Sequence, residues 1–218
     1  MKGQSIILAF SLVPVLFSAA KVFALSYDFT SPGAAVLDGS TSGDFIVDGI
    51  ALEVQAGLMN NLGDFTLGGN DAALLITTNG LGMTSDIAPS YQIQADTAIA
   101  GIHDGVVFNF DPLFIPETIS LASFFDSEDI RMYVDGALVG DFLGDSSGSK
   151  TINLGGGTIS SLAITSLGDN SPLQSSDDSD YYVASIKGTV VPEPSTMLLL
   201  GTGIAGLAGS RLRRKKSA

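Results

Sequence analysis

The side chains in this sequence that could do chemistry are one histidine and many carboxylates. His103 is the only histidine, and it stands beside Asp104 in a segment that we expect to be an exposed turn. A catalytic histidine needs a nucleophile to activate and usually a carboxylate to orient it. We expect no serine nucleophile elbow, and the absence of cysteine removes thiol nucleophiles and thiolate metal sites. The sequence therefore predicts no catalytic residues and a protein that is not an enzyme.

Two acidic clusters are candidates for a calcium site. They are Asp126-Ser127-Glu128-Asp129 and Asp177-Asp178-Ser179-Asp180. Calcium takes about six to eight oxygen ligands, and loops between strands supply both carboxylates and backbone carbonyls. Neither cluster matches the Asp-x-Asp-x-Asp-Gly-x5-Glu loop, so solvated acidic loops are the alternative. We predict no cofactor and leave calcium as an open possibility.

The charge of the chain is divided sharply between its middle and its ends. Residues 25–191 hold 22 of the 23 acidic residues but only three basic ones, Arg131, Lys150 and Lys187, which gives a formal net charge of −19. A module of this charge is repelled by nucleic-acid phosphates, which argues against nucleic acid as a partner. Divalent cations or cationic partners fit better, and a solubilising, self-repelling surface is the alternative.

The N-terminus has the pattern of a secretory signal peptide. Lys2 supplies the positive charge, residues 6–20 are mainly apolar, and Val22 and Ala24 occupy the −3 and −1 positions of a cleavage site. We therefore predict that residues 1–24 form a signal peptide that is cleaved after Ala24. The remaining chain is then exported from the cytoplasm.

The C-terminus combines three features in a fixed order. Pro192-Glu193-Pro194 is an extended polar segment, because proline does not continue a helix. Residues 197–209 are apolar and glycine-rich, and as a helix would be about 20 Å long, short of the roughly 30 Å of a hydrocarbon core. A basic cluster follows: Arg211, Arg213, Arg214, Lys215 and Lys216. The positive-inside rule places this cluster in the cytoplasm.

As a whole, this tail resembles the PEP-CTERM sorting signal, with an ordinary single-span anchor as the alternative. The resemblance implies that residues 192–218 are a sorting signal with a short transmembrane helix, recognised and removed by exosortase. Exosortase is a membrane enzyme of Gram-negative bacteria, many of which also make exopolysaccharide. The resemblance implies transient anchoring in the inner membrane, followed by transfer to the cell surface or the extracellular matrix.

Residues 25–191 between the two signals show an all-β pattern. Asp48-Gly49 and Asp135-Gly136 each separate two apolar runs and predict hairpins. Val106, Phe108 and Phe110 alternate with other residues and predict one buried strand face, whereas residues 79–90 look like a loop. We expect an antiparallel β-sandwich of jelly-roll type, and a barrel is the alternative.

The combined pattern predicts a non-enzymatic surface or matrix protein that is associated with biofilm or exopolysaccharide. The alternative is a carbohydrate-binding, lectin-like module. Its aromatic candidates are the five tyrosines, Tyr27, Tyr91, Tyr133, Tyr181 and Tyr182, because the chain has no tryptophan. A hydrolase is a third hypothesis, although a pair of carboxylates carries little information among so many acids.

Overall fold

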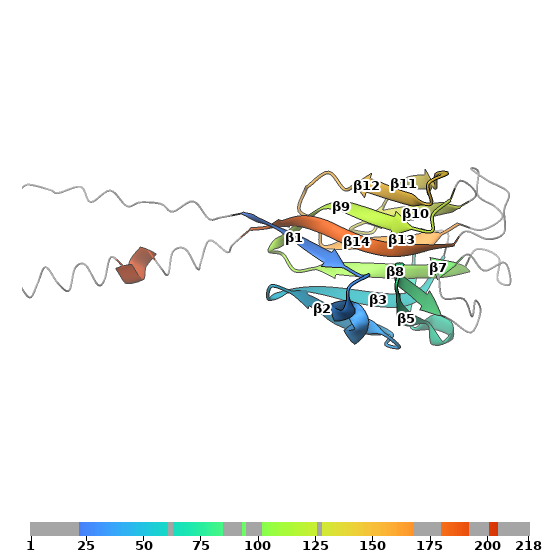
Figure 1. The fold of residues 1–218 in the computed structure, drawn as a ribbon, viewed down its shortest axis with the longest axis horizontal. Coiled ribbons are helices and arrows are strands. Elements are labelled where there is room, and N and C mark those ends of the chain that lie inside the picture. Colours follow the sequence, from blue (N-terminus) through green and yellow to red (C-terminus); the bar gives the residue numbers. More distant parts are fainter. Residues whose placement is uncertain are drawn as a thin grey trace, which may run out of the picture.

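The computed structural model describes residues 22–60, 63–84, 93–94, 102–125, 128–167, 180–191 and 201–204. In these residues, fourteen strands form two seven-stranded antiparallel sheets that face each other (Figure 1). The prediction of an all-β antiparallel sandwich is therefore confirmed. The more detailed assignment to the jelly-roll type stays a prediction.

The first sheet is built around the last strand of the chain. Its order is β12 (Ser149–Asn153), β9 (Phe114–Ala122), β14 (Asp180–Val190), β6 (Gly80–Thr84) and β5 (Ala73–Thr77), and β1 (Phe23–Asp28) and β7 (Ile93–Gln94) also pair with β14. β9 follows β14 from Tyr182 to Val190. β1, β7 and β6 share the opposite edge of β14, which is therefore an interior strand.

The second sheet contains both hairpins that the sequence predicts. Its order is β11 (Ala137–Leu143), β10 (Asp129–Val134), β13 (Ser161–Ser166), β8 (Ile102–Phe110), β3 (Ile50–Asn60) and β2 (Ser42–Val47), and β4 (Phe65–Leu67) pairs with β3. Two short 3-10 helices, η1 (Pro32–Leu37) and η2 (Gly69–Asp71), connect strands.

The two predicted hairpin turns use backbone conformations that the Asp-Gly pairs permit. Asp48 and Gly49 have φ values of 51° and 82°, and Asp135 and Gly136 have 49° and 76°. Positive φ at both central residues suits the right-handed twist of paired strands. The Asp135 carboxylate also accepts hydrogen bonds from the backbone and hydroxyl of Ser160 and the backbone of Ser161, and these bonds lower its pKa.

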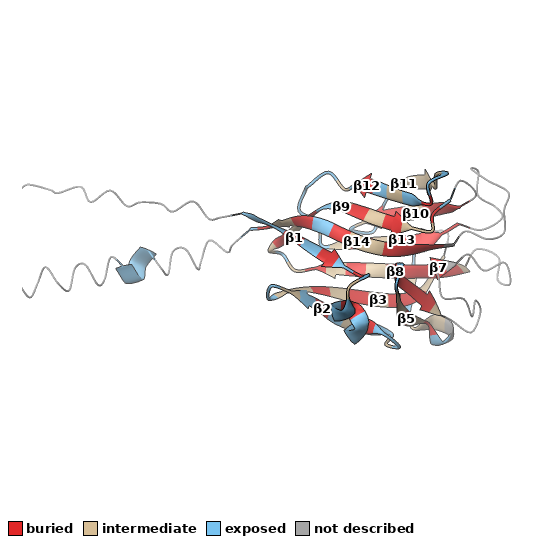
Figure 2. Cartoon of the chain, viewed as in Figure 1, coloured by how far each residue is buried: buried red, intermediate tan, exposed pale blue. Residues whose placement is uncertain are grey.

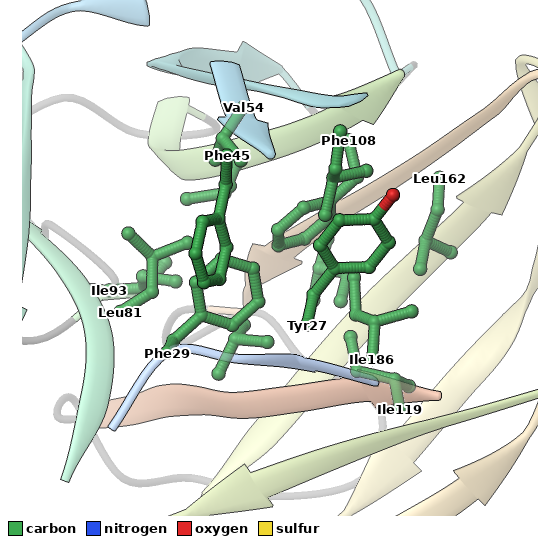
Figure 3. Packing of buried hydrophobic residues seen from close by; sticks show 14 of the residues in the cluster. Tyr27, Phe29, Phe45, Val54, Leu81, Ile93, Phe108, Ile119, Leu162 and Ile186 are labelled. Carbon is green, nitrogen blue, oxygen red and sulfur yellow. The ribbon is translucent and has the colours of Figure 1, made fainter. Parts of the chain in front are cut away.

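The hydrophobic core lies between the sheets. Phe108 of β8 packs against Phe29, with 5.9 Å between ring centroids, and Tyr27 meets Phe114 edge to face at 5.1 Å. Figure 3 shows Tyr27, Phe29 and Phe108 gathered between the two layers. Burial of each large side chain contributes roughly 1.5–3 kcal/mol. Figure 2 shows burial concentrated on strands such as β14 and β8, whereas much of β2 is exposed.

The prediction of a loop over residues 79–90 is wrong at its start, because β6 occupies Gly80–Thr84. Gly80, one of the glycines that suggested a loop, is needed for a close approach between strands. A Cβ atom at Gly80 would lie 2.4 Å from the Val183 carbonyl oxygen of β14, and Gly80 has a φ of 130°. Residues 85–90 lie outside the described part of the chain.

The close approach of β6 to β14 predicts that Gly80→Ala destabilises the domain. The new Cβ would clash with backbone and would have to adopt a φ that L-residues avoid, at a cost of about 2–3 kcal/mol. Thermal unfolding would measure the loss. Gly157→Ala is the matched control, since a Cβ there meets nothing within 4 Å and the residue is exposed. Equal midpoints for the two variants would contradict this account.

Candidate functional site

His103 lies within strand β8 and is only 6% exposed, so the prediction of an exposed turn is wrong. Asp104 is completely buried. Neighbouring side chains on a strand point to opposite faces. Asp104 shares the core face with Val106 and Phe108, whereas His103 belongs to the outer face. The two side chains therefore lie on opposite faces of β8, and the absence of a catalytic triad stays a prediction.

A small group of polar side chains lies at one end of the core. Asp104 of β8 and Ser166 of β13 occupy the core face of neighbouring strands, and Thr165 donates a hydrogen bond of 2.9 Å to the Asp104 carbonyl oxygen. The hydroxyls of Ser166 and Tyr181 are buried and have no hydrogen-bond partner among the described residues. Burial, and then the charge of Asp104, raises the pKa of Tyr181 well above its usual value.

The first predicted calcium cluster is only partly described. Glu128 and Asp129 are buried, and the Glu128 carboxylate accepts a hydrogen bond from the Phe125 backbone nitrogen. Asp126 and Ser127, and residues 177–179 of the second cluster, lie outside the described residues, as does the side chain of Asp180. Within the described part, no three metal-ligating side chains form a group that could hold a metal ion. Calcium binding stays a prediction.

The sequence does contain one segment with Gly-x-Ser-x-Gly spacing, contrary to the expectation of none. It is Gly144-Asp145-Ser146-Ser147-Gly148. A nucleophile elbow joins a strand to a helix, whereas this segment joins strand β11 to strand β12. The Asp145 carboxylate accepts hydrogen bonds from the Ser147 backbone and hydroxyl, which lower its pKa. The segment is therefore a connection between two strands that is stabilised by hydrogen bonds within itself.

The tyrosines that could stack on a sugar ring are largely buried. Tyr27 and Tyr181 are 0% exposed, Tyr133 is 5% and Tyr182 is 8% exposed. Tyr91 lies outside the described residues. None of the four described rings forms an exposed platform, and the lectin-like alternative stays a hypothesis.

The two ends of the β domain meet in one ladder. Phe23 of β1 pairs with Val190 of β14, and Ala24 pairs with Thr189 (Figure 1). On its other edge, β14 continues to pair with β9, and the Val191 backbone nitrogen donates to the Leu113 carbonyl oxygen at 2.7 Å. The chain is therefore held by strand pairing up to the residue before Pro192.

From that point the sequence matches a known family model. Residues 190–215 match the model described as the PEP-CTERM protein-sorting motif. The tail is a PEP-CTERM sorting motif. This motif implies an exported protein that is sorted and processed by exosortase.

The other comparisons add little to the PEP-CTERM assignment. No curated protein matches the chain. One similar solved structure is GH31 CBM32-2 bound to GalNAc, with 14% identity and a TM-score of 0.30, covering 80% of this chain and all of that one. Another is CBM51-2 in complex with GlcNAc and INT domains from Clostridium perfringens ZmpB, with 10% identity and a TM-score of 0.30, covering 78% of this chain and 41% of that one. TM-scores this low support no inference about fold or ligand.

The residues predicted to act in sorting are mostly outside the described part of the chain. These are Pro192, Glu193 and Pro194 of the PEP-CTERM tripeptide, and the basic residues Arg211, Arg213, Arg214, Lys215 and Lys216. Residues 201–204 are helical, and no helix among the described residues is long and apolar enough to cross a membrane. The predicted cleavage residue Ala24 lies inside β1.

The two fully buried tyrosines predict opposite effects when their hydroxyls are removed. Tyr27 donates a hydrogen bond of 3.2 Å to the Ile50 carbonyl oxygen, so Tyr27→Phe should lower the free energy of unfolding by about 1 kcal/mol. Tyr181→Phe removes a buried hydroxyl without such a bond and should raise it by about 1 kcal/mol. Urea unfolding of both variants measures the two signs. A loss for Tyr181→Phe equal to that for Tyr27→Phe would contradict this interpretation.

The same two tyrosines predict a loss of stability at alkaline pH. Burial raises the pKa of both hydroxyls above the ordinary 10.0, so the folded state keeps protons that the unfolded state releases. The folded state therefore binds more protons than the unfolded state above pH 10, so each tyrosine makes the free energy of unfolding fall as the pH rises above that value, whatever its contribution at neutral pH. Urea unfolding at about pH 8 and about pH 11 should show this decrease, and Tyr27→Phe should make it smaller.

Proposed function

We propose that this chain is an exported, non-enzymatic protein of the cell surface or extracellular matrix. Its PEP-CTERM tail anchors it transiently in the inner membrane, and exosortase then cleaves the tail and releases the folded β domain. The observation that carries the proposal is the sorting motif at residues 190–215, which begins at the end of the interior strand β14.

The geometry around Val191 supports processing close to the folded domain. Val191 is still hydrogen-bonded to Leu113, and the PEP-CTERM tripeptide begins at the next residue. Pro192 and Pro194 disfavour helix, so the sequence favours an extended recognition segment immediately after Val191. The processing enzyme must therefore work at the end of the domain where β1 and β14 meet.

The charge of the domain supports a role in a hydrated layer outside the cell. A net charge of −19 over residues 25–191 makes released copies repel one another and stay soluble. Arg131, one of only three basic residues in the domain, is held by Asp141 in a two-bond ion pair with distances of 2.7 and 2.8 Å. We propose exopolysaccharide as the surrounding material, with divalent cations neutralising the acidic surface.

Two arrangements among the described residues support the proposal that the protein is not an enzyme. Its only histidine and the adjacent aspartate point to opposite faces of β8. The Gly-x-Ser-x-Gly segment lies between two strands instead of before a helix. Neither arrangement offers an activated nucleophile.

The proposal predicts that replacing Pro192, Glu193 and Pro194 together by alanine traps the protein. The variant should stay full-length and membrane-bound, because exosortase no longer recognises the tail, whereas wild type is shortened and released. Immunoblots of membrane and extracellular fractions measure the difference, which should exceed about tenfold in released protein. Ser195→Ala with Thr196→Ala is the matched control and should behave like wild type. Normal release of the triple variant would disprove the proposal.

A further inference from the structure

The sorting motif and the predicted signal-peptide cleavage site share one strand ladder. The matched motif starts at residue 190, and Val190 pairs with Phe23. Cleavage after Ala24 would cut β1 between Ala24, which pairs with Thr189, and Leu25, which pairs with Gly188. The two processing events therefore act on neighbouring residues of the same two strands.

The predicted cleavage site separates an exposed part of β1 from a part whose inward side chains are buried. Leu25 is 4% exposed and Tyr27 is 0% exposed, so the part of β1 after the cut is held in the core. Phe23 is 44% exposed and Val22 is 58% exposed. Removal of the signal peptide therefore takes away only the exposed start of the strand, while residues 25–28 keep their pairing with β14.

The cut changes one edge of β14 and leaves the other intact. Without Phe23 and Ala24, Thr189 and Val190 have no β1 residue opposite them. On the other edge they still pair with Ile115 and Phe114 of β9. The result is a short strand edge, fixed from one side and open on the other, directly before the PEP-CTERM tripeptide.

We propose that removal of the signal peptide uncovers this edge as a docking strand for the enzyme that cleaves the tail. The proposal rests on the proposed function, since it names a second contact for the same processing event. The partner supplies an extended segment that pairs with Thr189–Val191, as peptides pair with exposed sheet edges elsewhere. The tail is thus recognised twice, by its tripeptide and by the strand that leads into it.

The pairing of β14 with β9 favours such docking because it lowers the backbone entropy that is lost on binding. A free peptide loses backbone entropy when it becomes extended on an enzyme. Thr189, Val190 and Val191 are already held extended by β9 and by the hydrogen bond to Leu113, so less of this loss remains. Before signal cleavage, Phe23 and Ala24 occupy the same edge. The proposal therefore predicts that signal cleavage precedes tail cleavage.

The test uses two full-length chains that differ only at the start of the mature protein. A foreign signal peptide is fused so that cleavage leaves either Leu25 or Val22 as the first residue, and both chains carry the same tail. The chain that begins at Val22 keeps the pairs to Thr189 and Val190, and we expect its tail to be cleaved at least about fivefold more slowly in a pulse-chase. Equal rates would overturn the proposal.

A third chain checks that strand pairing causes the delay. It begins at Val22 but carries Phe23→Pro and Ala24→Pro, which remove the backbone donors that pairing needs. Its tail should be cleaved as fast as that of the chain beginning at Leu25. A persistent delay would point to the three extra residues themselves and would overturn the proposal. Resistance of all three chains to added protease verifies that each domain is folded.

The alanine variant of Pro192, Glu193 and Pro194, made in the chain that begins at Leu25, separates the two hypotheses. If it is trapped while the Val22 and Leu25 chains are processed at equal rates, exosortase sorting holds and only the docking edge fails. If the alanine variant is released normally, the proposed function fails, and the docking proposal that rests on it fails as well.

Discussion

The pairing of β14 with its neighbours is the interaction on which the rest of this domain depends. β14 is the last strand in the sequence, yet it lies inside the first sheet, between β9 on one edge and β1, β6 and β7 on the other. These contacts join residues from the beginning, middle and end of the chain. Long-range strand pairing of this kind forms slowly, since the loops between the strands must close first. The first sheet cannot be completed until the residues just before the tail are available.

The same strand explains several local features of the sequence. Glycine is required where another backbone approaches β14 closely. A Cβ atom at Gly188 of β14 itself would lie 2.1 Å from the Ile115 carbonyl oxygen of β9, and one at Gly80 would meet Val183 of β14 in the same way. Tyr181, in the same strand, brings a hydroxyl into the core beside the buried Asp104. The strands around β14 are therefore closely packed backbone against backbone. The core beside the Tyr181 end of β14 contains buried polar groups.

The sequence predicts the parts of this structure that depend on local chemistry. The Asp-Gly pairs at 48–49 and 135–136 indicate their hairpins because few other residues accept positive φ. The alternation of Val106, Phe108 and Phe110 predicts a buried face, and the order of tripeptide, apolar run and basic cluster identifies the tail. Features that depend on distant neighbours are missed. Gly80 suggests a loop until β14 is placed beside it, and His103 looks exposed until the strand is seen to begin at Ile102.

The antiparallel pairing of the first and last strands also determines how the domain bears mechanical load. Both ends of the β domain leave from the same side, where Phe23 lies opposite Val190. A force that separates these two ends would peel β1 from β14 one residue pair at a time, which is a weak direction. A force applied through the tail alone, against a load on the far side of the sandwich, runs along β14 and strains its pairs with β9 together. The proposed tether through the tail would thus load the domain along β14, where the pairs with β9 share the force.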